Sequence, residues 1–170
     1  MNQLPTIRLR ALEPEDLDLL YRIENNDALW SVGTTNVPYS RYVLHDYIAS
    51  TRSDIYADRQ LRLMIEDDSK QVVGIIDLVN FDPRHLRAEV GIVIVSERRR
   101  LGYATAAVRE IRRYAAEILH LHQLYAVIAS DNLPAIQLFR NTQFNRENLL
   151  HDWLATGDKY QDAVLMQTFF

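Results

Sequence analysis

A turn rich in arginine is the part of the sequence best suited to binding a charged ligand. The segment Arg98–Arg100 consists of arginines only, and it precedes Gly102, which has no side chain, and Ala104, which has a single methyl group. A ligand can approach the backbone closely at such positions. The apolar stretch 90–95 before the turn predicts a strand, and the amphipathic pattern after it predicts a helix. Because backbone N–H groups at a helix start attract anions, the turn predicts a site for a small polyanion such as a pyrophosphate.

Metal and thiol chemistry have little support in the sequence. The chain contains no cysteine, which excludes disulfides, thiol nucleophiles and cysteine metal ligands. His85, His120 and His122 lack the spacing of a metal-binding motif, and His45 and His151 are isolated. We therefore expect no metal ion.

Length and composition indicate one globular domain that spans residues 1–170, because 170 residues with 48% apolar side chains can form a substantial core. The net charge of -4 argues against general affinity for nucleic acid or acidic membranes. No apolar run approaches the roughly 18 to 20 residues that span a bilayer, and the first residues lack the pattern of a signal peptide. We expect a cytoplasmic protein without nucleic-acid or membrane partners.

Hydrophobic periodicity predicts alternating strands and helices without linkers or repeats. Ser40 is a suitable N-cap for one helix, and either Asp131 or Asn132 for another. The apolar faces of two helices should include Val43 and Ile118, respectively. In chain order, we expect a strand at 7–9, helices from 14 and after 40, strands at 61–66, 72–79 and 87–95, a helix at 104–120, a strand at 124–129, a helix after 132, and strands at 149–154 and 163–169.

The arginine-rich turn and the order of elements resemble the GNAT superfamily of N-acetyltransferases. Arg99, Gly102 and Ala104 fill the fixed positions of its signature Gln/Arg-x-x-Gly-x-Gly/Ala, between the expected strand and helix. The resemblance covers nearly the whole chain. It implies an α/β (α+β) fold, with a mixed, mostly antiparallel central sheet of about seven strands flanked by about four helices.

A second stretch, at 130–144, is similar to the family pattern Asn-x-x-Ala-x-x-Leu/Ile-Tyr-x-x-x-Gly-Phe, and it departs from that pattern twice. Phe139 replaces a tyrosine that protonates the departing thiolate in many members, and a phenyl ring has no proton to give. Gln143 replaces a glycine, so we expect the helix to end without glycine's easily reached left-handed conformation. The matching residues are Asn132, Ala135, Leu138 and Phe144.

The resemblance implies acetyl-CoA as co-substrate, with three groups of residues around it. The backbone of the core strand should hold the pantetheine arm and polarise the thioester carbonyl, and the helix start at 132 should flank that arm. The turn should bind the pyrophosphate. The implied contacts are Ile92, Val93 and Ile94 on the strand, Arg99, Arg100, Leu101, Gly102, Tyr103, Ala104 and Thr105 in the turn, and Asn132, Ala135 and Phe139.

Direct acetyl transfer to an amine, which the resemblance also implies, needs a group that removes a proton from the ammonium ion. Glu89, upstream of the turn on the same expected strand, is the first candidate for this catalytic base, and Asp77 on the preceding strand is the second. Either carboxylate could instead lie on an exposed strand face or pair with Arg84 or Arg87.

The segments Val73–Val79, Arg87–Glu89, Leu150–Trp153 and Gly157–Tyr160 resemble the family branch that contains spermidine and ribosomal-protein N-terminal acetyltransferases. The implied acceptor is a primary amine of a polyamine such as spermidine, another small amine or a peptide N-terminus. Two readings stay open, an enzyme and a non-catalytic CoA-binding regulatory domain, and self-association into a homo-oligomer is compatible with both. Carboxylates that could face a polycation are Glu24, Asp27, Asp46 and Asp54, although such residues are often only solvated.

Overall fold

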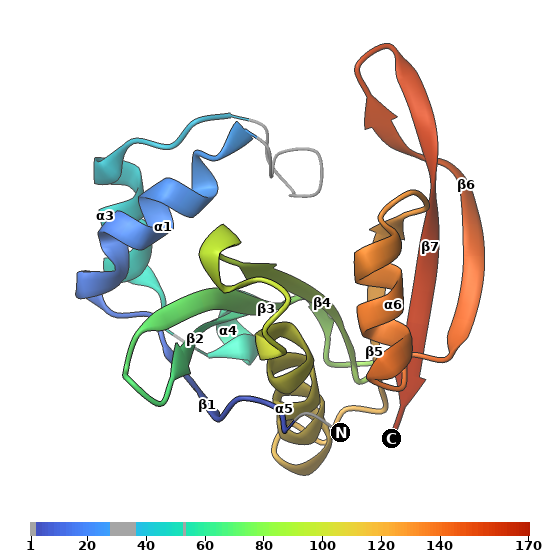
Figure 1. The fold of residues 1–170 in the computed structure, drawn as a ribbon, viewed down its shortest axis with the longest axis horizontal. Helices are drawn as coiled ribbons and strands as arrows, with labels where there is room; N and C mark the ends of the chain where they lie inside the picture. The colour runs from blue at the N-terminus through green and yellow to red at the C-terminus, as the bar shows by residue number, and fades with distance from the viewer. Residues whose placement is uncertain (1–2, 28–36, 53) are drawn as a thin grey trace.

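Seven strands form one mixed sheet in the order β1-β2-β3-β4-β5-β7-β6 (Figure 1). The computed structural model describes residues 3–27, 37–52 and 54–170. All neighbouring strands are antiparallel except β4 and β5, which are parallel, so the expected mixed and mostly antiparallel sheet is confirmed. The strands are β1 Ile7–Ala11, β2 Leu61–Asp67, β3 Val72–Asp82, β4 Arg87–Ile94, β5 Gln123–Ala129, β6 Arg146–Thr156 and β7 Lys159–Phe169.

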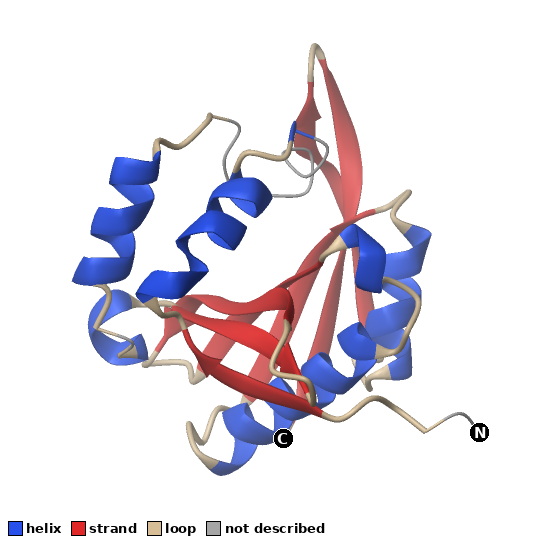
Figure 2. Ribbon diagram, turned by 60° about the vertical axis from the view of Figure 1, so that its left-hand side comes forward, coloured by secondary structure: helices blue, strands red, loops and turns tan. Residues whose placement is uncertain are grey.

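Helices cover both faces of this sheet (Figure 2). Helices α1 (Leu17–Glu24) and α3 (Arg41–Ser50) pack on one face, and α5 (Tyr103–Glu117) and α6 (Leu133–Asn141) pack on the other. The single-turn 3₁₀ helices η1 (Pro14–Asp16) and η2 (Ser96–Arg98) precede α1 and α5. These four α-helices were expected. A further helix, α4 (Ile55–Asp58), was not, because four residues are too few to show helical periodicity.

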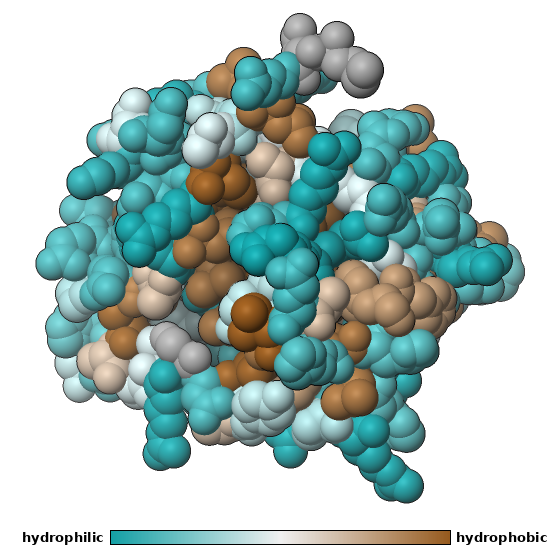
Figure 3. Space-filling view, turned by 90° about the horizontal axis from the view of Figure 1, so that it is seen from below, coloured by the Kyte–Doolittle hydropathy of each residue, from teal (hydrophilic) through white to brown (hydrophobic). Residues whose placement is uncertain are grey.

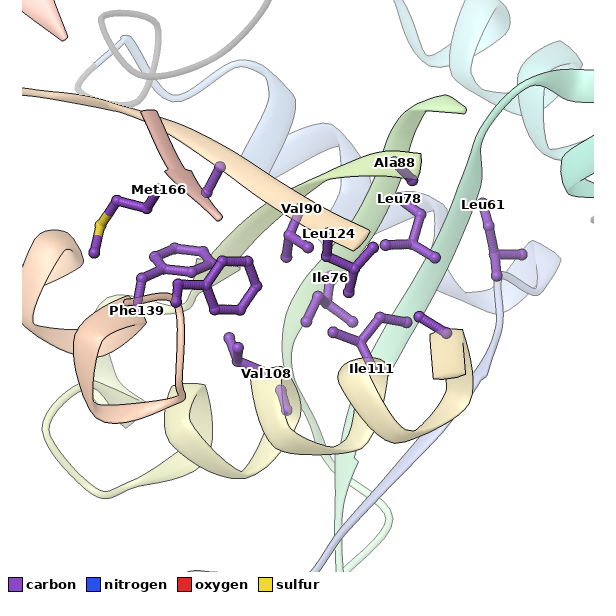
Figure 4. Packing of buried hydrophobic residues seen from close by; sticks show 14 of the residues in the cluster. Leu61, Ile76, Leu78, Ala88, Val90, Val108, Ile111, Leu124, Phe139 and Met166 are labelled. Carbon is purple, nitrogen blue, oxygen red and sulfur yellow. The ribbon is translucent and has the colours of Figure 1, made fainter. Parts of the chain in front are cut away.

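Alternation along β3 divides the apolar residues between two cores. Ile76 and Leu78 point to the α5 and α6 side, where they meet Val108 and Ile111 (Figure 4). Ile75 points the other way and packs with residues of α1 and α3. The surface seen in Figure 3 is largely polar, with an irregular band of apolar side chains.

Two predicted apolar faces are wrong in detail. Val43 is 47% exposed because it lies in the first turn of α3 on the solvent side, where its N–H donates to the capping Oγ of Ser40. Ile118 is 58% exposed because α5 ends at Glu117, one residue earlier. The last two strands are longer than expected, and together they form a hairpin that projects beyond the rest of the sheet (Figure 1).

Helix α6 has well-defined caps at both ends. Asn132, rather than Asp131, is its N-cap, with Oδ1 accepting a hydrogen bond from the Ala135 N–H at 3.3 Å. At the other end, Gln143 adopts a left-handed conformation with φ 73°. The Phe144 N–H donates to the Phe139 carbonyl, and the Gln143 N–H donates to the Arg140 carbonyl. This is a Schellman ending, so the expectation that the helix avoids a left-handed residue is wrong.

Replacing Gln143 with glycine should therefore stabilise the protein. A non-glycine residue in the left-handed region costs about 1 kcal/mol, so we expect Gln143→Gly to raise the free energy of unfolding by about 0.5–1 kcal/mol. Chemical denaturation measures the change. Gln143→Ala is the matched control, because it removes the same exposed side chain without relieving the backbone. Equal stability of the two variants would contradict the explanation.

Candidate active site

The parallel strands β4 and β5 pair over only part of their length. Their register runs through Arg87–Gln123, Ala88–Leu124 and Glu89–Tyr125, and the described residues show no pairing between the two strands beyond it. β4 nevertheless continues to Ile94 and β5 to Ala129. The backbone of Ile92, which faces the β5 side, is therefore available to a ligand in the middle of the sheet, as expected. The Val95 N–H donates to the Val73 carbonyl of β3, so Val93, two residues earlier on β4, also turns its backbone groups toward β3, which corrects the expectation for Val93.

A row of backbone donors follows β4. Within the described part of the chain, no backbone or side-chain group accepts a hydrogen bond from the N–H groups of residues 100–105. Arg100 and Gly102 are both left-handed, with φ 60° and 89°, so the backbone curls before α5 begins at Tyr103. A curled run of free N–H groups at a helix start is a binding site for an anion.

Gly102 was expected to let a ligand approach the backbone, but the structure gives another reason for a glycine at this position. A Cβ atom there would lie 3.0 Å from Cδ of Pro5 and 3.3 Å from Cδ2 of Leu4. Glycine is thus required by the positive φ and by the N-terminal segment that packs against the turn. The side of Gly102 that lacks a Cβ does not face an open ligand site, which corrects the reason given for this position.

Side chains of the arginine-rich segment brace the turn. Nε of Arg99 donates to the Ile94 carbonyl at 3.0 Å and so ties the turn to the end of β4. The Ile94 carbonyl, expected to hold the pantetheine arm, already has this partner. Nη1 of Arg98 lies 3.7 Å from the buried carboxylate of Asp67, the last residue of β2. Arg100 and Leu101 are exposed, whereas the side chains of Tyr103 and Ala104 pack partly against the core and Thr105 is half-buried.

The start of α6 lies at the same end of the separated strands as the turn. Since β4 and β5 are parallel, their carboxyl ends share one edge of the sheet, and Asn132 and Ala135 follow β5 directly.

Phe139, which was expected to contact the cofactor, lies in the core instead. It is only 3% exposed and packs edge-to-face on Phe144 with ring centroids 4.9 Å apart (Figure 4). Its ring belongs to the core and offers no exposed surface to a cofactor.

Glu89 occupies the last paired position before β4 and β5 separate. Its carboxylate accepts a hydrogen bond from Nδ2 of Asn80 at 2.8 Å. Tyr125 is its register partner on β5 and lies on the same face of the sheet. Burial and the negative charge of Glu89 raise the pKa of Tyr125, so the phenol stays protonated. Arg87 pairs with Asp82 instead of Glu89.

Asp77, the second candidate base, is already bound by arginine. Both carboxylate oxygens of Asp77 accept hydrogen bonds from Arg62, each at 2.9 Å, and Glu24 of α1 binds the same guanidinium at 2.5 Å. Burial disfavours the charged guanidinium, but the two carboxylates more than offset this effect and raise the pKa of Arg62. Asp77 therefore serves to neutralise a half-buried cation. The expected partners, Arg84 and Arg87, are not the ones it contacts.

The four acidic residues expected near the acceptor do not form one cluster. Glu24 points to Arg62, and Asp54 caps α4 by accepting a hydrogen bond from the Tyr56 N–H. Asp27 and Asp46 are exposed. In the described ranges, no group of three or more His, Cys, Asp or Glu side chains could hold a metal ion, and no helix is long and apolar enough to cross a membrane.

Sequence reasoning proposed the turn, Glu89 and Asn132 as site residues, and it did not anticipate that Asn80, Tyr125 and Arg62 lie beside the two candidate bases. Asn80 and Tyr125 meet Glu89 only through the register of three strands, which one sequence does not reveal. The pairing of Arg62 with Asp77 is a cross-strand contact of the same kind.

Comparison with known proteins places this geometry in a family. The acetyltransferase (GNAT) domain model matches residues 6–145. The spermidine N(1)-acetyltransferase of Escherichia coli strain K12 is 30% identical over 169 residues, with 96% of this chain and 86% of that protein covered. The crystal structure of spermidine N-acetyltransferase from Vibrio cholerae in complex with CoA and spermine has a TM-score of 0.85 at 27% identity and covers 96% of this chain and 95% of its own. A dodecameric structure of the Vibrio cholerae enzyme has a TM-score of 0.79 at 28% identity, with 96% and 93% covered.

The structural role of Asp77 predicts a loss of stability on neutralisation. Asp77→Asn leaves Arg62 with one carboxylate fewer in a half-buried position, and should lower the free energy of unfolding by about 1–3 kcal/mol. Glu147→Gln is the matched control, because Glu147 makes a similar two-bond contact with Arg140 on the exposed surface, where the cost should stay below about 1 kcal/mol. If chemical denaturation shows an equally small loss of unfolding free energy for both variants, the contact between Arg62 and Asp77 does not stabilise the fold.

Proposed function

Because the chain belongs to the acetyltransferase (GNAT) domain family, we propose that it transfers the acetyl group of acetyl-CoA to a primary amine of a polyamine such as spermidine. The protein is an N-acetyltransferase, and the reading as a non-catalytic domain is set aside. The observation that carries the proposal is the gap between β4 and β5. This gap begins after Glu89 and ends near the turn whose N–H groups have no partner in the described residues. The polyamine acceptor is supported by the relatives, which are named for spermidine or were solved with spermine.

The proposed binding site of acetyl-CoA lies along the separated ends of β4 and β5. The pyrophosphate lies on the N–H groups of residues 100–105, where a helix start and two left-handed residues present donors without partners. The pantetheine arm pairs with the backbone of Ile92 on the side from which β5 has departed. Asn132 and Ala135 flank the other side of the arm. The thioester then points toward Glu89 and Tyr125, the last residue pair in the register of β4 and β5.

Glu89 acts as the general base in this proposal. It takes a proton from the ammonium group of the acceptor, the freed amine nitrogen attacks the thioester carbon, a C–N bond forms and the C–S bond breaks. The thiolate of CoA leaves and takes a proton from water, since Phe139 has no hydroxyl. Glu89 suits the role because a neutral amide donates to its carboxylate, whereas Asp77 is bound by a cation.

Self-association is part of the proposal. The β6–β7 hairpin exposes Leu149, Trp153 and Tyr160, and it forms one edge of the sheet. Large exposed apolar side chains at a sheet edge suit an interface between subunits, and a structural neighbour is a dodecamer. The cytoplasmic location expected from the sequence stays a prediction.

Deleting one donor from the turn should weaken cofactor binding. Ala104→Pro removes one N–H group at the second position of α5, and the chain itself accepts proline at the second position of α6, at Pro134. We expect the Kd for CoA to rise about tenfold, the loss of one charge-assisted hydrogen bond of about 1.4 kcal/mol. Calorimetry measures the Kd. Ala104→Ser, which keeps the N–H, should bind like the parent. An unchanged Kd in a folded Ala104→Pro protein would refute the proposed binding of the pyrophosphate at this turn.

The acceptor is tested by thiol release from acetyl-CoA over a panel of spermidine, spermine, free lysine and peptides with free N-termini. A polyamine should give the highest kcat/KM, by about tenfold or more over lysine, because each added ammonium group strengthens the attraction to a protein of net charge -4. Turnover with peptides alone would replace the polyamine with a protein N-terminus. CoA binding without turnover on any amine would contradict the enzymatic assignment.

A further inference from the structure

A β-bulge in β3 places an amide beside the proposed base. The register shifts between Val79 and Asp82, so that β3 has one residue more than β4 over this stretch. Val79 lies opposite Glu89, and Asp82 lies opposite Arg87. In an unbroken register Asn80 would face Ala88, which is fully buried in the core on the α5 side. The bulge instead brings the Asn80 amide to the Glu89 carboxylate, 2.8 Å away.

The bulge is fixed from the core side. Phe81 is buried, its N–H donates to the Arg59 carbonyl, and its ring packs edge-to-face on Tyr56 of α4 at 5.2 Å between centroids. Asn80 therefore takes a left-handed conformation, with φ 50°, while Phe81 anchors the strand. Asparagine tolerates this conformation better than most side chains. Bulges of this kind re-aim side chains and are frequent next to active sites.

We propose that Asn80 is a positioning residue that holds the Glu89 carboxylate at the point where β4 and β5 separate. The inference rests on the proposed role of Glu89 as base. An amide donor fixes the orientation of a carboxylate without the full positive charge that Arg62 brings to Asp77. The charged groups around Glu89 are consistent with this role. Among the described residues, no lysine, arginine or histidine forms an ion pair with it, the nearby Arg87 pairs with Asp82, and Tyr125 on β5 is a neutral phenol.

A substitution at Asn80 can remove the amide without disturbing the backbone. Glycine favours the left-handed region, so Asn80→Gly deletes the hydrogen bond to Glu89 and retains the bulge. We expect Asn80→Gly to lower kcat about tenfold on the best amine and to leave the KM for acetyl-CoA unchanged, because a misplaced base affects proton removal and not cofactor binding. Its thermal unfolding midpoint should equal or exceed that of the parent.

The double-mutant cycle with Glu89→Gln separates positioning from a structural effect. If Asn80 acts through the carboxylate, Asn80→Gly should cost nothing further in a Glu89→Gln background. Asn80→Asp supplies a second variant of nearly the same shape, in which a repelling carboxylate replaces the donor, and it should lower kcat in the parent background as well.

The outcomes distinguish this inference from the function on which it rests. Parent-like kcat in Asn80→Gly, with Glu89→Gln strongly impaired, overturns the positioning role alone. Equal losses from Asn80→Gly in both backgrounds also overturn it, because the effect would then not pass through Glu89. Parent-like kcat in Glu89→Gln overturns both the base and its positioning residue.

Discussion

The separation of two parallel strands in the middle of a sheet is the constraint on which the rest of this structure depends. Sheets normally satisfy every interior backbone group, and an unpaired group buried away from water costs free energy comparable to a lost hydrogen bond. In the described ranges, β4 and β5 do not pair with each other beyond Glu89 and Tyr125, so the backbone of Ile92 has no strand partner on that side. The fold can sustain this gap because β3 pairs with β4 and β7 pairs with β5, so that each separated strand keeps a neighbour on its other side.

Charge compensation then decides which acidic residue remains available for chemistry. Asp77 and Glu89 both lie on the face of the sheet toward α1 and α3, on neighbouring strands. Asp77 meets a half-buried guanidinium that would be costly to leave unpaired, and the contact holds its carboxylate in place. Glu89 meets an amide and a phenol. Two similar carboxylates therefore differ in function because of the residue that the neighbouring strand presents to each.

Local patterns predicted much of this arrangement, and the register of the strands determined the rest. Period-2 and period-3.6 alternation identified the strands and four of the helices, because each buries one continuous face. Helix α4 was missed because it has a single turn. The contacts of Glu89 escaped prediction since they depend on a bulge of one residue in β3. Gly102 matched a motif, yet its neighbour is the N-terminal segment, nearly a hundred positions away in the sequence. Gln143 took the conformation of glycine because the hydrogen bonds that end α6 require it there.

The absent hydroxyl at position 139 shows which proton the proposed reaction most needs help to move. An alkyl ammonium group has a pKa of about 10.4, so at neutral pH its deprotonation costs about 4.6 kcal/mol, whereas a thiolate with a pKa of about 8.5 lies only about 2 kcal/mol from its protonated form. Removing the proton from the amine is thus the larger task. A phenol at position 139 would also bury a hydroxyl beside Phe144, where an unpaired one costs about 1–3 kcal/mol. The chain instead uses Phe139 for packing and gathers its polar groups around Glu89, on the side of the reaction where the proton is harder to remove.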